Sequence, residues 1–242
     1  MKVQNLAAIV TGGGSGLGEA TALALAEAGA KVAILDFNED AALAVASRIG
    51  GIGIRCDVSD EKSVATALLA AANANGAAHI LVNCAGVAPA RKILGRDGAM
   101  PLDEYRRVID TNLVGTFNVL KQFAETASAR DALDTGERGV IVNTASVAAY
   151  EGQIGQSAYA SSKAGVVGLT ITAAREFARD GIRVCTIAPG IFETAMLRGL
   201  PEAAQESLGQ SVPFPSRLGR PEEFAALVLH IVQNEMLNGE TI

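Results

Sequence analysis

The chain has 242 residues, of which 49% are hydrophobic and 19% charged, and its formal net charge is −6. These values predict one large domain with a substantial core and exclude a disordered or fibrous protein. The acidic balance argues against nucleic acid or an anionic membrane as the main partner. Neither a signal-like or transit-like segment nor an apolar run of bilayer length is found, so we expect a cytoplasmic protein without membrane contact.

Short apolar runs alternate with helical patterns along the whole chain. The predicted strands are Leu6–Val10, Lys31–Leu35, Ile52–Cys56, His79–Val82, Gly139–Asn143 and Arg183–Ile187. The predicted helices are Gly18–Ala28, Asp40–Arg48, Glu61–Asn73, Leu102–Ala127, Ser157–Arg179 and Pro221–Val232. This β-α alternation predicts an α/β protein with a doubly wound parallel sheet, Rossmann-like, in a single domain spanning residues 1–242.

A glycine-rich turn, Thr11–Gly18, follows the first predicted strand and opens the first helix. In this position backbone amides and the helix N-terminus can approach a pyrophosphate. The spacing is T-G-x-x-x-G-x-G, a looser turn than G-x-G-x-x-G, but strand, turn and helix occur in the required order. The turn therefore predicts a dinucleotide site, with cofactor-binding residues Gly12, Ser15, Gly16, Leu17 and Gly18.

The ends of the next strands carry further candidate cofactor-binding residues. Asp36 ends the second strand, where its carboxylate can bind both ribose hydroxyls and would repel a 2′-phosphate. No Arg or Lys stands beside it or inside the glycine turn, so NAD is favoured over NADP. Asp57 and Val58 could bracket the adenine. The small residues at the end of the fourth strand let the backbone pass close to the ribose; they are Asn83, Cys84, Ala85 and Gly86.

Two long excursions, residues 87–101 and 191–218, follow predicted strands at the edge of the sheet where an α/β protein binds its ligand. The first carries Arg91, Lys92 and Arg96, which could meet the phosphates of a substrate or form a solvated surface loop. We expect the first to be an insertion loop beside the substrate and the second to be a substrate lid.

Tyr159 and Lys163 are four residues apart on a predicted helix and therefore share one face. A tyrosine with its ordinary pKa of about 10 is a poor base, and a nearby ammonium would lower that pKa toward neutrality. Ser146 could hold a substrate oxygen while Tyr159 moves a proton, so both are predicted to bind substrate. The three cysteines lack metal-ligand spacing, and buried reduced thiols are predicted; Cys84 is expected to be an apolar spacer.

In their order and spacing these motifs resemble the short-chain dehydrogenase/reductase family over essentially the whole chain. The resemblance implies a catalytic tetrad of Asn112, Ser146, Tyr159 and Lys163. Asn112 would hold a water that links Lys163 to solvent; the alternative is a solvent-facing helix asparagine. The resemblance also implies nicotinamide contacts from the segment that begins the lid, at Pro189, Gly190, Ile191, Phe192 and Thr194.

A narrower resemblance links residues 139–149, 151–156 and 212–219 to the 3-hydroxyacyl-CoA dehydrogenase type 2 subfamily, also called 17β-hydroxysteroid dehydrogenase type 10. It implies NAD-dependent oxidation of a 3-hydroxyacyl-CoA in fatty acid metabolism, some activity on alcohols and steroids, and a homotetramer. That family closes with a last strand and a tail, but this chain stops at Ile242. We therefore expect the last strand to be truncated, which leaves the tetramer in doubt.

Three alternatives remain open at this stage. The chain could be a 3-oxoacyl-carrier-protein reductase or a general ketoreductase, although Asp36 disfavours the NADPH that such enzymes prefer. It could also be a dehydrogenase of a steroid or other secondary alcohol. A non-catalytic NAD-binding scaffold belongs to a different class, and such a protein would not need the complete Ser146, Tyr159 and Lys163 set.

Overall fold

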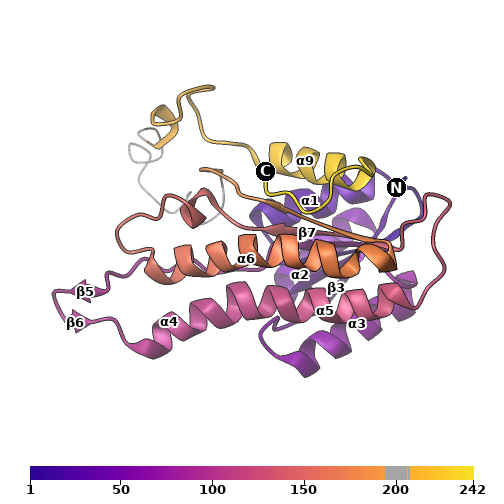
Figure 1. The fold of residues 1–242 in the computed structure, drawn as a ribbon, viewed down its shortest axis with the longest axis horizontal. Coiled ribbons are helices and arrows are strands. Elements are labelled where there is room, and N and C mark those ends of the chain that lie inside the picture. Colours follow the sequence, from indigo (N-terminus) through magenta and orange to yellow (C-terminus); the bar gives the residue numbers. More distant parts are fainter. Residues whose placement is uncertain (194–205, 207) are drawn as a thin grey trace.

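The computed structural model describes residues 1–193, 206 and 208–242, and a parallel sheet forms its centre (Figure 1). Within these residues the sheet has six strands in the order β3-β2-β1-β4-β7-β8. The chain reverses direction across the sheet between β1 and β4, which is where a doubly wound sheet opens a ligand crevice. The strands are β1 (Ala7–Thr11), β2 (Lys31–Asp36), β3 (Ile52–Arg55), β4 (Ile80–Asn83), β7 (Gly139–Thr144) and β8 (Ile182–Ile187).

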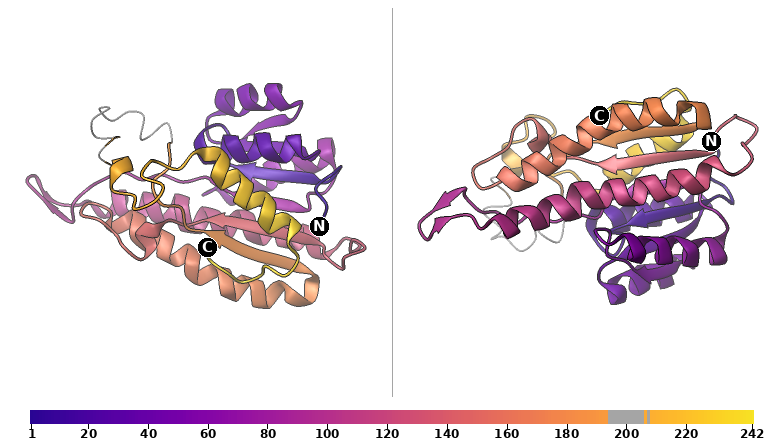
Figure 2. Two further views of the ribbon diagram at one scale, coloured as in Figure 1. Left: turned by 90° about the horizontal axis from the view of Figure 1, so that it is seen from above. Right: turned by 60° about the horizontal axis from the view of Figure 1, so that its bottom comes forward.

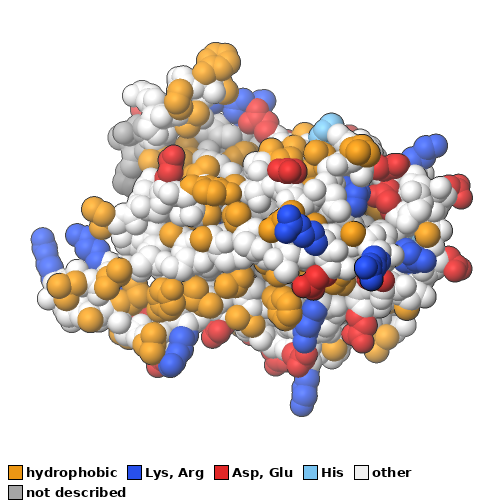
Figure 3. Space-filling model, viewed as in Figure 1, with side chains coloured by type: hydrophobic (Ala, Val, Ile, Leu, Met, Phe, Trp, Pro, Cys, Tyr) orange, Lys and Arg blue, Asp and Glu red, His pale blue; other side chains and the backbone are white. Residues whose placement is uncertain are grey.

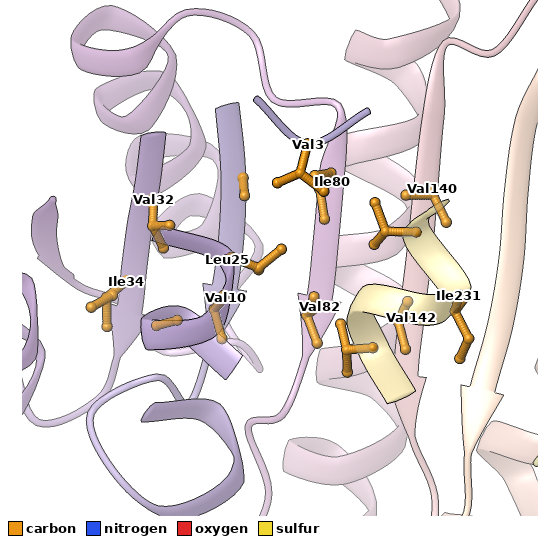
Figure 4. Close-up of a cluster of buried hydrophobic side chains, with 14 of the residues drawn as sticks. Val3, Val10, Leu25, Val32, Ile34, Ile80, Val82, Val140, Val142 and Ile231 are labelled. Carbon is orange, nitrogen blue, oxygen red and sulfur yellow. The ribbon is translucent and has the colours of Figure 1, made fainter. Parts of the chain in front are cut away.

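Helices cover both faces of this sheet (Figure 2). One face packs against α1 (Gly16–Glu27), α2 (Glu39–Ile49) and α9 (Pro221–Gln233), as the buried cluster in Figure 4 illustrates. The other packs against α3 (Glu61–Asn75), α5 (Gly115–Ser128) and α6 (Ser157–Glu176). The central strands are apolar on both sides because both sides are covered. The predicted doubly wound parallel fold is confirmed. No described helix combines the length and apolar character needed to cross a membrane.

The helix predicted over Leu102–Ala127 is interrupted. It divides into α4 (Leu102–Ile109), a π-helical segment at Asp110–Val114, and α5. A π-helical turn contains an additional residue, which changes the direction in which the neighbouring side chains point. As a result Asn112 is fully buried, and the interpretation of this residue as a solvent-facing helix asparagine is wrong.

The two long excursions differ in how they are built. Residues 87–101 contain a short antiparallel hairpin, β5 (Leu94–Gly95) with β6 (Gly98–Ala99), which projects away from the sheet beside α4 (Figure 1). Of the predicted lid, residues 194–205 and 207 lie outside the described part of the chain. Its two described ends meet through backbone hydrogen bonds, from Gly219 to Ile191 and from Glu193 to Gly219.

The C-terminal residues pair with β8, where a closing strand was expected to be mostly missing. Gly239 donates a backbone hydrogen bond to Val184, and Thr186 exchanges hydrogen bonds with Glu240 and Ile242. Thr186 and Thr241 form a parallel bridge. The edge of β8 is thus covered by a short segment that ends at Ile242. Two short 3₁₀ helices complete the described elements, Val147–Ala149 after β7 and Phe177–Asp180 after α6.

Candidate active site

A cavity of about 950 Å³ follows the carboxyl ends of the central strands. It brings together residues that are widely separated in the chain: the glycine turn, the ends of β2 and β4, Ser146, and the start of α6. Of the predicted site residues, it is bordered by Gly12, Ser15, Gly16, Leu17, Gly18, Asp36, Asp57, Val58, Cys84, Ala85, Gly86, Ser146, Tyr159, Lys163, Pro189, Gly190, Ile191 and Phe192. Thr194 lies outside the described residues.

The glycine turn is packed too tightly to hold side chains at two of its positions. A Cβ atom on Gly18 would lie 2.2 Å from the carbonyl oxygen of Gly12, an impossible contact. Gly12 has a φ of +63°, and a Cβ there would lie 2.7 Å from the backbone of Ala85. This close packing holds the turn and the N-terminus of α1 against the end of β4, at the edge of the cavity.

Asp36 is held at the cavity by backbone groups on two sides. Its carboxylate accepts hydrogen bonds from the amide of Gly14, at 3.0 Å, and from the amide of Asn38, at 2.9 Å. Both oxygens keep a further lone pair for a ligand. The carboxylate thus lies fixed between the glycine turn and the start of α2, in the position where ribose hydroxyls were predicted to bind.

No cation stands beside Asp36 in the sequence, but the neighbouring strand carries one. Arg55 is its register partner on β3, although nineteen positions separate them in the chain. The guanidinium of Arg55 lies over the ring of Phe37, with 5.3 Å between its central carbon and the ring centroid. Sequence reasoning missed Arg55 because strand register, not proximity in the chain, brings it to the strand position beside Asp36.

Tyr159, Ser146 and Lys163 meet at the opposite end of the cavity. The Ser146 hydroxyl accepts a hydrogen bond from the amide of Ala148, at 3.1 Å, and its own hydrogen remains available. Burial raises the pKa of Tyr159, and the Ser146 hydroxyl acts in the opposite direction. The net direction is opposite to the one predicted for a tyrosine beside an ammonium, because removal of the phenolate from water outweighs the nearby polar groups.

Lys163 is buried, and its ammonium is held by the backbone. Its Nζ donates to the carbonyl oxygen of Thr144, at 2.7 Å, and lies 5.7 Å from the centroid of the Tyr159 ring. Burial lowers the pKa of Lys163 to about 8, well below that of an exposed lysine. Thr144, at the end of β7, was not predicted, since a backbone carbonyl partner leaves no signal in the sequence. It determines where the lysine side chain ends.

Asn112 does not border the cavity but lies directly behind it. Its Oδ1 accepts from the amide of Val87 at 2.8 Å, and its Nδ2 donates to the carbonyl of Val87 at 2.9 Å. The same Nδ2 donates to Ser162 at 3.0 Å, and the Ser162 hydroxyl donates to the carbonyl of Tyr159 at 2.7 Å. Asn112 therefore connects the start of the 87–101 excursion to the turn of α6 that carries Tyr159.

Two predicted residues at the carboxyl end of β4, Asn83 and Cys84, have different surroundings. Asn83 is buried below the cavity, where its Nδ2 donates to Asn143 at 2.9 Å; its side chain joins neighbouring strands and does not border the cavity. Cys84 does border it, and burial raises the pKa of its thiol to about 11. A thiol that stays protonated is a poor nucleophile, in keeping with an apolar spacer. Cys56 and Cys185 are buried free thiols, as predicted.

The cavity also contains polar side chains that sequence reasoning did not assign. Gln153 and Gln156, from the segment before α6, border it near Tyr159, and Arg107 and Thr111 border it from α4 and the π-helical segment. The Gln156 side chain accepts a hydrogen bond from the amide of Gln153, at 3.0 Å. Both glutamines lie in residues 151–156, one of the segments on which the narrower resemblance rests. Their polar side chains in that segment were the signal that could have identified them as site residues.

Comparisons with known proteins give the relatives of this chain. A sequence model of the short chain dehydrogenase family matches residues 6–205. The chain is 48% identical to 3-hydroxyacyl-CoA dehydrogenase type-2 of Drosophila melanogaster, over 99% of this chain and 96% of that one. It is also 48% identical to 3-hydroxyacyl-CoA dehydrogenase type-2 of Homo sapiens, over 99% of this chain and 94% of the other.

The fold has a close counterpart among solved structures. The crystal structure of 3-hydroxyacyl-CoA dehydrogenase type-2 from Mycobacterium avium superposes with a TM-score of 0.94 and 41% sequence identity, covering 98% of this chain and 93% of that chain. The family match and the full-length relatives, together with the cavity described above, lead to one assignment: the chain belongs to the short-chain dehydrogenase family.

Proposed function

We propose that this protein is an NAD-dependent dehydrogenase that oxidises a 3-hydroxyacyl-CoA to the 3-oxoacyl-CoA. The observation that carries the proposal is one cavity with a fixed carboxylate, Asp36, at one end and Ser146, Tyr159 and Lys163 at the other. The substrate class is supported by relatives named 3-hydroxyacyl-CoA dehydrogenase type-2, to which the chain is similar over nearly its whole length.

The residues around the cavity fit a nicotinamide adenine dinucleotide. The tight glycine turn presents backbone amides and the start of α1, which suit a pyrophosphate. Asp36 has free lone pairs for two ribose hydroxyls and carries a negative charge that disfavours a 2′-phosphate. The segment from Pro189 to Phe192, which leads into the lid, borders the same cavity as Tyr159, and we place the nicotinamide contacts there. When bound, the dinucleotide supplies the acceptor for the hydride.

Tyr159 is assigned the proton transfer. As the phenolate, its Oη would take the proton from the substrate hydroxyl as that carbon is oxidised. The free hydrogen of the Ser146 hydroxyl would bind the substrate oxygen and hold it at Tyr159 while it becomes a carbonyl. Lys163, with one hydrogen on Thr144, keeps two further hydrogens for the Tyr159 oxygen and the nicotinamide ribose.

Asn112 is assigned a positioning role. Both hydrogens of its Nδ2 are used, on Val87 and Ser162, and its Oδ1 already accepts from Val87. A water linking Lys163 to solvent would have to use the remaining lone pair of Oδ1. The described hydrogen bonds instead favour a residue that fixes the carboxyl side of β4 relative to the catalytic helix α6.

The acyl-CoA would enter over the 87–101 excursion, which contains the β5–β6 hairpin. A shallow hollow of about 380 Å³ adjoins the main cavity there, and Gln153 and Gln156 border both. Its walls include Lys92 and the exposed side chains of Leu94 and Ile154, a combination that suits an apolar chain next to a phosphate. Of the three loop cations, Arg91 pairs with Glu104 at 2.9 Å, whereas no ion pair within the described residues involves Lys92 or Arg96.

We also infer self-association to a homotetramer. The outer face of the π-helical segment and α5 exposes Val114 at 43% and Phe117 at 48%, and α6 exposes Ile171 at 40%. Hydrophobic side chains gather along this side of the molecule (Figure 3). Apolar side chains spread over adjacent helices favour burial against another subunit. Light scattering during size exclusion would give four times the 24.8 kDa chain mass if the inference is right.

The test of the function is a set of initial rates with NAD and with NADP. The substrates are 3-hydroxyacyl-CoAs of increasing chain length, the same acyl groups on a carrier protein, a steroid and a small secondary alcohol. The highest kcat/KM is expected for an acyl-CoA with NAD. A preference for the carrier substrate with NADPH in the reverse direction would contradict the proposal, as would a preference for the steroid or alcohol. Binding of NAD without turnover of any substrate would indicate a scaffold.

A further inference from the structure

Phe192, at the wall of the large cavity, is held by residues that lie far from it in the chain. Its backbone forms a parallel bridge with Gly219, which donates to the carbonyl of Ile191 at 2.9 Å and accepts from the amide of Glu193 at 2.8 Å. Its ring meets the ring of Phe224 edge to face, with 6.4 Å between the centroids. Phe192 is therefore anchored to the start of α9.

The space beside Gly219 is filled by the Phe192 ring. A Cβ atom on Gly219 would lie 2.8, 2.9 and 2.9 Å from three carbons of that ring, closer than carbon atoms approach without a bond. The φ of Gly219 does not lie in the left-handed region, so its backbone conformation alone would accept other residues. The ring packed on its Cα atom therefore explains why this position is a glycine.

The chain on both sides of Gly219 is fixed to α9 by one carboxylate. Glu223 accepts two hydrogen bonds from the guanidinium of Arg217, at 2.6 and 2.8 Å, and one from the amide of Arg220, at 2.8 Å. The next residue, Phe224, is 1% exposed and belongs to the core between α9 and the sheet. The position of Gly219 is therefore determined by a helix that packs on the sheet, and the ring that lies on Gly219 has little freedom to turn.

We propose that Gly219 and Phe224 are positioning residues that hold the Phe192 ring in place before the dinucleotide binds, as a fixed wall for the nicotinamide. These three residues are called the Phe192 clasp below. The inference rests on the nicotinamide contacts proposed above and deepens them. Neither Gly219 nor Phe224 borders the cavity, so both act through Phe192. A ring fixed in advance loses no rotamer freedom on binding, which strengthens binding without an additional contact.

The Phe192 clasp should act on one half of the dinucleotide. The carbonyl of Pro189, three residues before Phe192, accepts a hydrogen bond from the amide of Val147 at 3.0 Å. Val147 follows Ser146 directly, so this segment lies at the Ser146 end of the cavity, whereas Asp36 lies at the other end. A displaced Phe192 ring should therefore weaken ligands that carry a nicotinamide and spare those that carry only the adenosine part.

The experiment measures equilibrium binding by calorimetry, independently of turnover. NADH, reduced nicotinamide mononucleotide and AMP are titrated into wild type and Gly219→Ala. The added methyl group must push the Phe192 ring aside, so NADH and the mononucleotide should bind about 10-fold more weakly. AMP, which has no nicotinamide, should bind unchanged, and its binding also shows that the variant is folded.

A double-mutant cycle shows whether the effect passes through the ring. Phe192→Leu alone should weaken NADH and the mononucleotide, because the fixed wall is lost. In the Phe192→Leu background, Gly219→Ala should cause almost no further change, since no ring remains for the methyl group to displace. Phe224→Leu keeps an apolar side chain in the core but removes the ring edge, and it should weaken the same two ligands about threefold.

Two matched controls separate these effects from general changes in packing. Gly168→Ala adds the same methyl group at an exposed position of α6, with no atom within 4 Å, and should change no affinity. Phe123→Leu shortens a phenylalanine of α5 that is 2% exposed, on the other face of the sheet. In urea denaturation it should lose about as much stability as Phe224→Leu, but it should leave the affinities for all three ligands unchanged.

The possible outcomes are distinguishable. If wild type binds neither NADH nor AMP, the dinucleotide site proposed above is wrong, and the Phe192 clasp with it. If wild type binds both and Gly219→Ala binds NADH equally well, the site stands and the clasp is overturned. The clasp is also overturned if Gly219→Ala weakens AMP as much as NADH, because the change is then not confined to the nicotinamide. An undiminished effect of Gly219→Ala in the Phe192→Leu background would overturn it as well, because Gly219 would then not act through the ring.

Discussion

The two ends of the cavity are built in different ways. At the end proposed to bind the nucleotide, called the nucleotide end below, the polar groups lie at strand ends and are fixed by the backbone: Gly12 donates to Leu35, and Gly14 and Asn38 donate to Asp36. At the end proposed to bind the substrate, called the substrate end below, the walls come from the projecting hairpin and the segment before α6. Their apolar side chains face solvent, with Leu94 75% and Ile154 85% exposed.

The sheet therefore determines the structure of the nucleotide end, whereas surface segments determine the structure of the substrate end. The nucleotide end is part of the sheet, so a change there alters a contact shared with the core. The substrate end consists of loops, which can change without disturbing the sheet. We therefore expect substitutions at the nucleotide end to affect every substrate equally, and substitutions in the hairpin to affect acyl-CoA more than small alcohols.

The largest expected effect lies at Tyr159, at the end of the cavity opposite Asp36. Tyr159→Phe removes the proposed proton acceptor and should lower kcat by about 10³-fold for every substrate, within the range attributed to general base catalysis. NADH affinity should change little, because the ring and the burial of Lys163 are retained. Tyr150→Phe, an exposed tyrosine nearby, is the matched control. Retention of even a tenth of the wild-type kcat in Tyr159→Phe would exclude the proposed role.

Asn112→Ala should affect stability as well as turnover. It leaves the Val87 amide and carbonyl and the Ser162 hydroxyl without their partner in a buried region, at a cost of about 2–3 kcal/mol of unfolding free energy. Urea denaturation gives the loss, and Asn73→Ala, at an exposed position of α3, should lose almost nothing. If Asn112→Ala were as stable as Asn73→Ala, the hydrogen bonds to Val87 would not be holding the excursion.

Asp36→Ala tests the nucleotide end, and its outcome depends on Arg55. Removing the carboxylate should weaken NADH about 10-fold and strengthen NADPH, because the negative charge is lost while the register-paired cation remains. Affinities from fluorescence titration give the ratio of the two. The change should be the same with an acyl-CoA and with a small alcohol as substrate. An unchanged NADH to NADPH ratio would show that Asp36 does not read the ribose.

The residues that sequence reasoning assigned to the nucleotide nearly all border one cavity, because the signals for them are local. A strand, a glycine turn and a helix are consecutive in the chain, and Asp36 ends a strand whose position the apolar pattern predicts. The residues it missed depend on contacts across the fold. Arg55 becomes a neighbour of Asp36 through strand register, and Thr144 holds Lys163 through a backbone carbonyl.

The surroundings of Asn112 and Tyr159 show a second limit. An asparagine within a helical pattern has no predictable direction when a π-helical turn changes the helix at that point. The sign of the Tyr159 pKa shift depends on how deeply the phenol is buried, and a spacing of four residues from Lys163 does not contain that information. Distance along the helix was predicted correctly, but the balance between burial and charge required the packed structure.

The pH dependence of the oxidation is a sharper test of that balance. Since the Ser146 hydroxyl lowers the pKa of Tyr159 against the effect of burial, Ser146→Ala should raise this pKa further. The rising limb of kcat/KM against pH, which reports phenolate formation in the free enzyme, should then move to higher pH. Ser161→Ala, on an exposed turn of the same helix, should leave the limb in place. A shift to lower pH in Ser146→Ala would contradict the assignment.

The smallest effect is expected at the substrate end, from neutralising the loop cations. Exposed charges contribute about 0.2–1 kcal/mol each, so Lys92→Gln with Arg96→Gln should raise KM for an acyl-CoA about threefold to 10-fold. Adding Arg91→Gln should change KM little more, because Arg91 is already paired with Glu104. KM for a small secondary alcohol should stay constant, and added salt should reduce the difference between wild type and variant. Equal increases of KM for both substrates would mean that the hairpin shapes the cavity without binding the CoA phosphates. Substitutions at the substrate end would then affect all substrates equally, as those at the nucleotide end are expected to do.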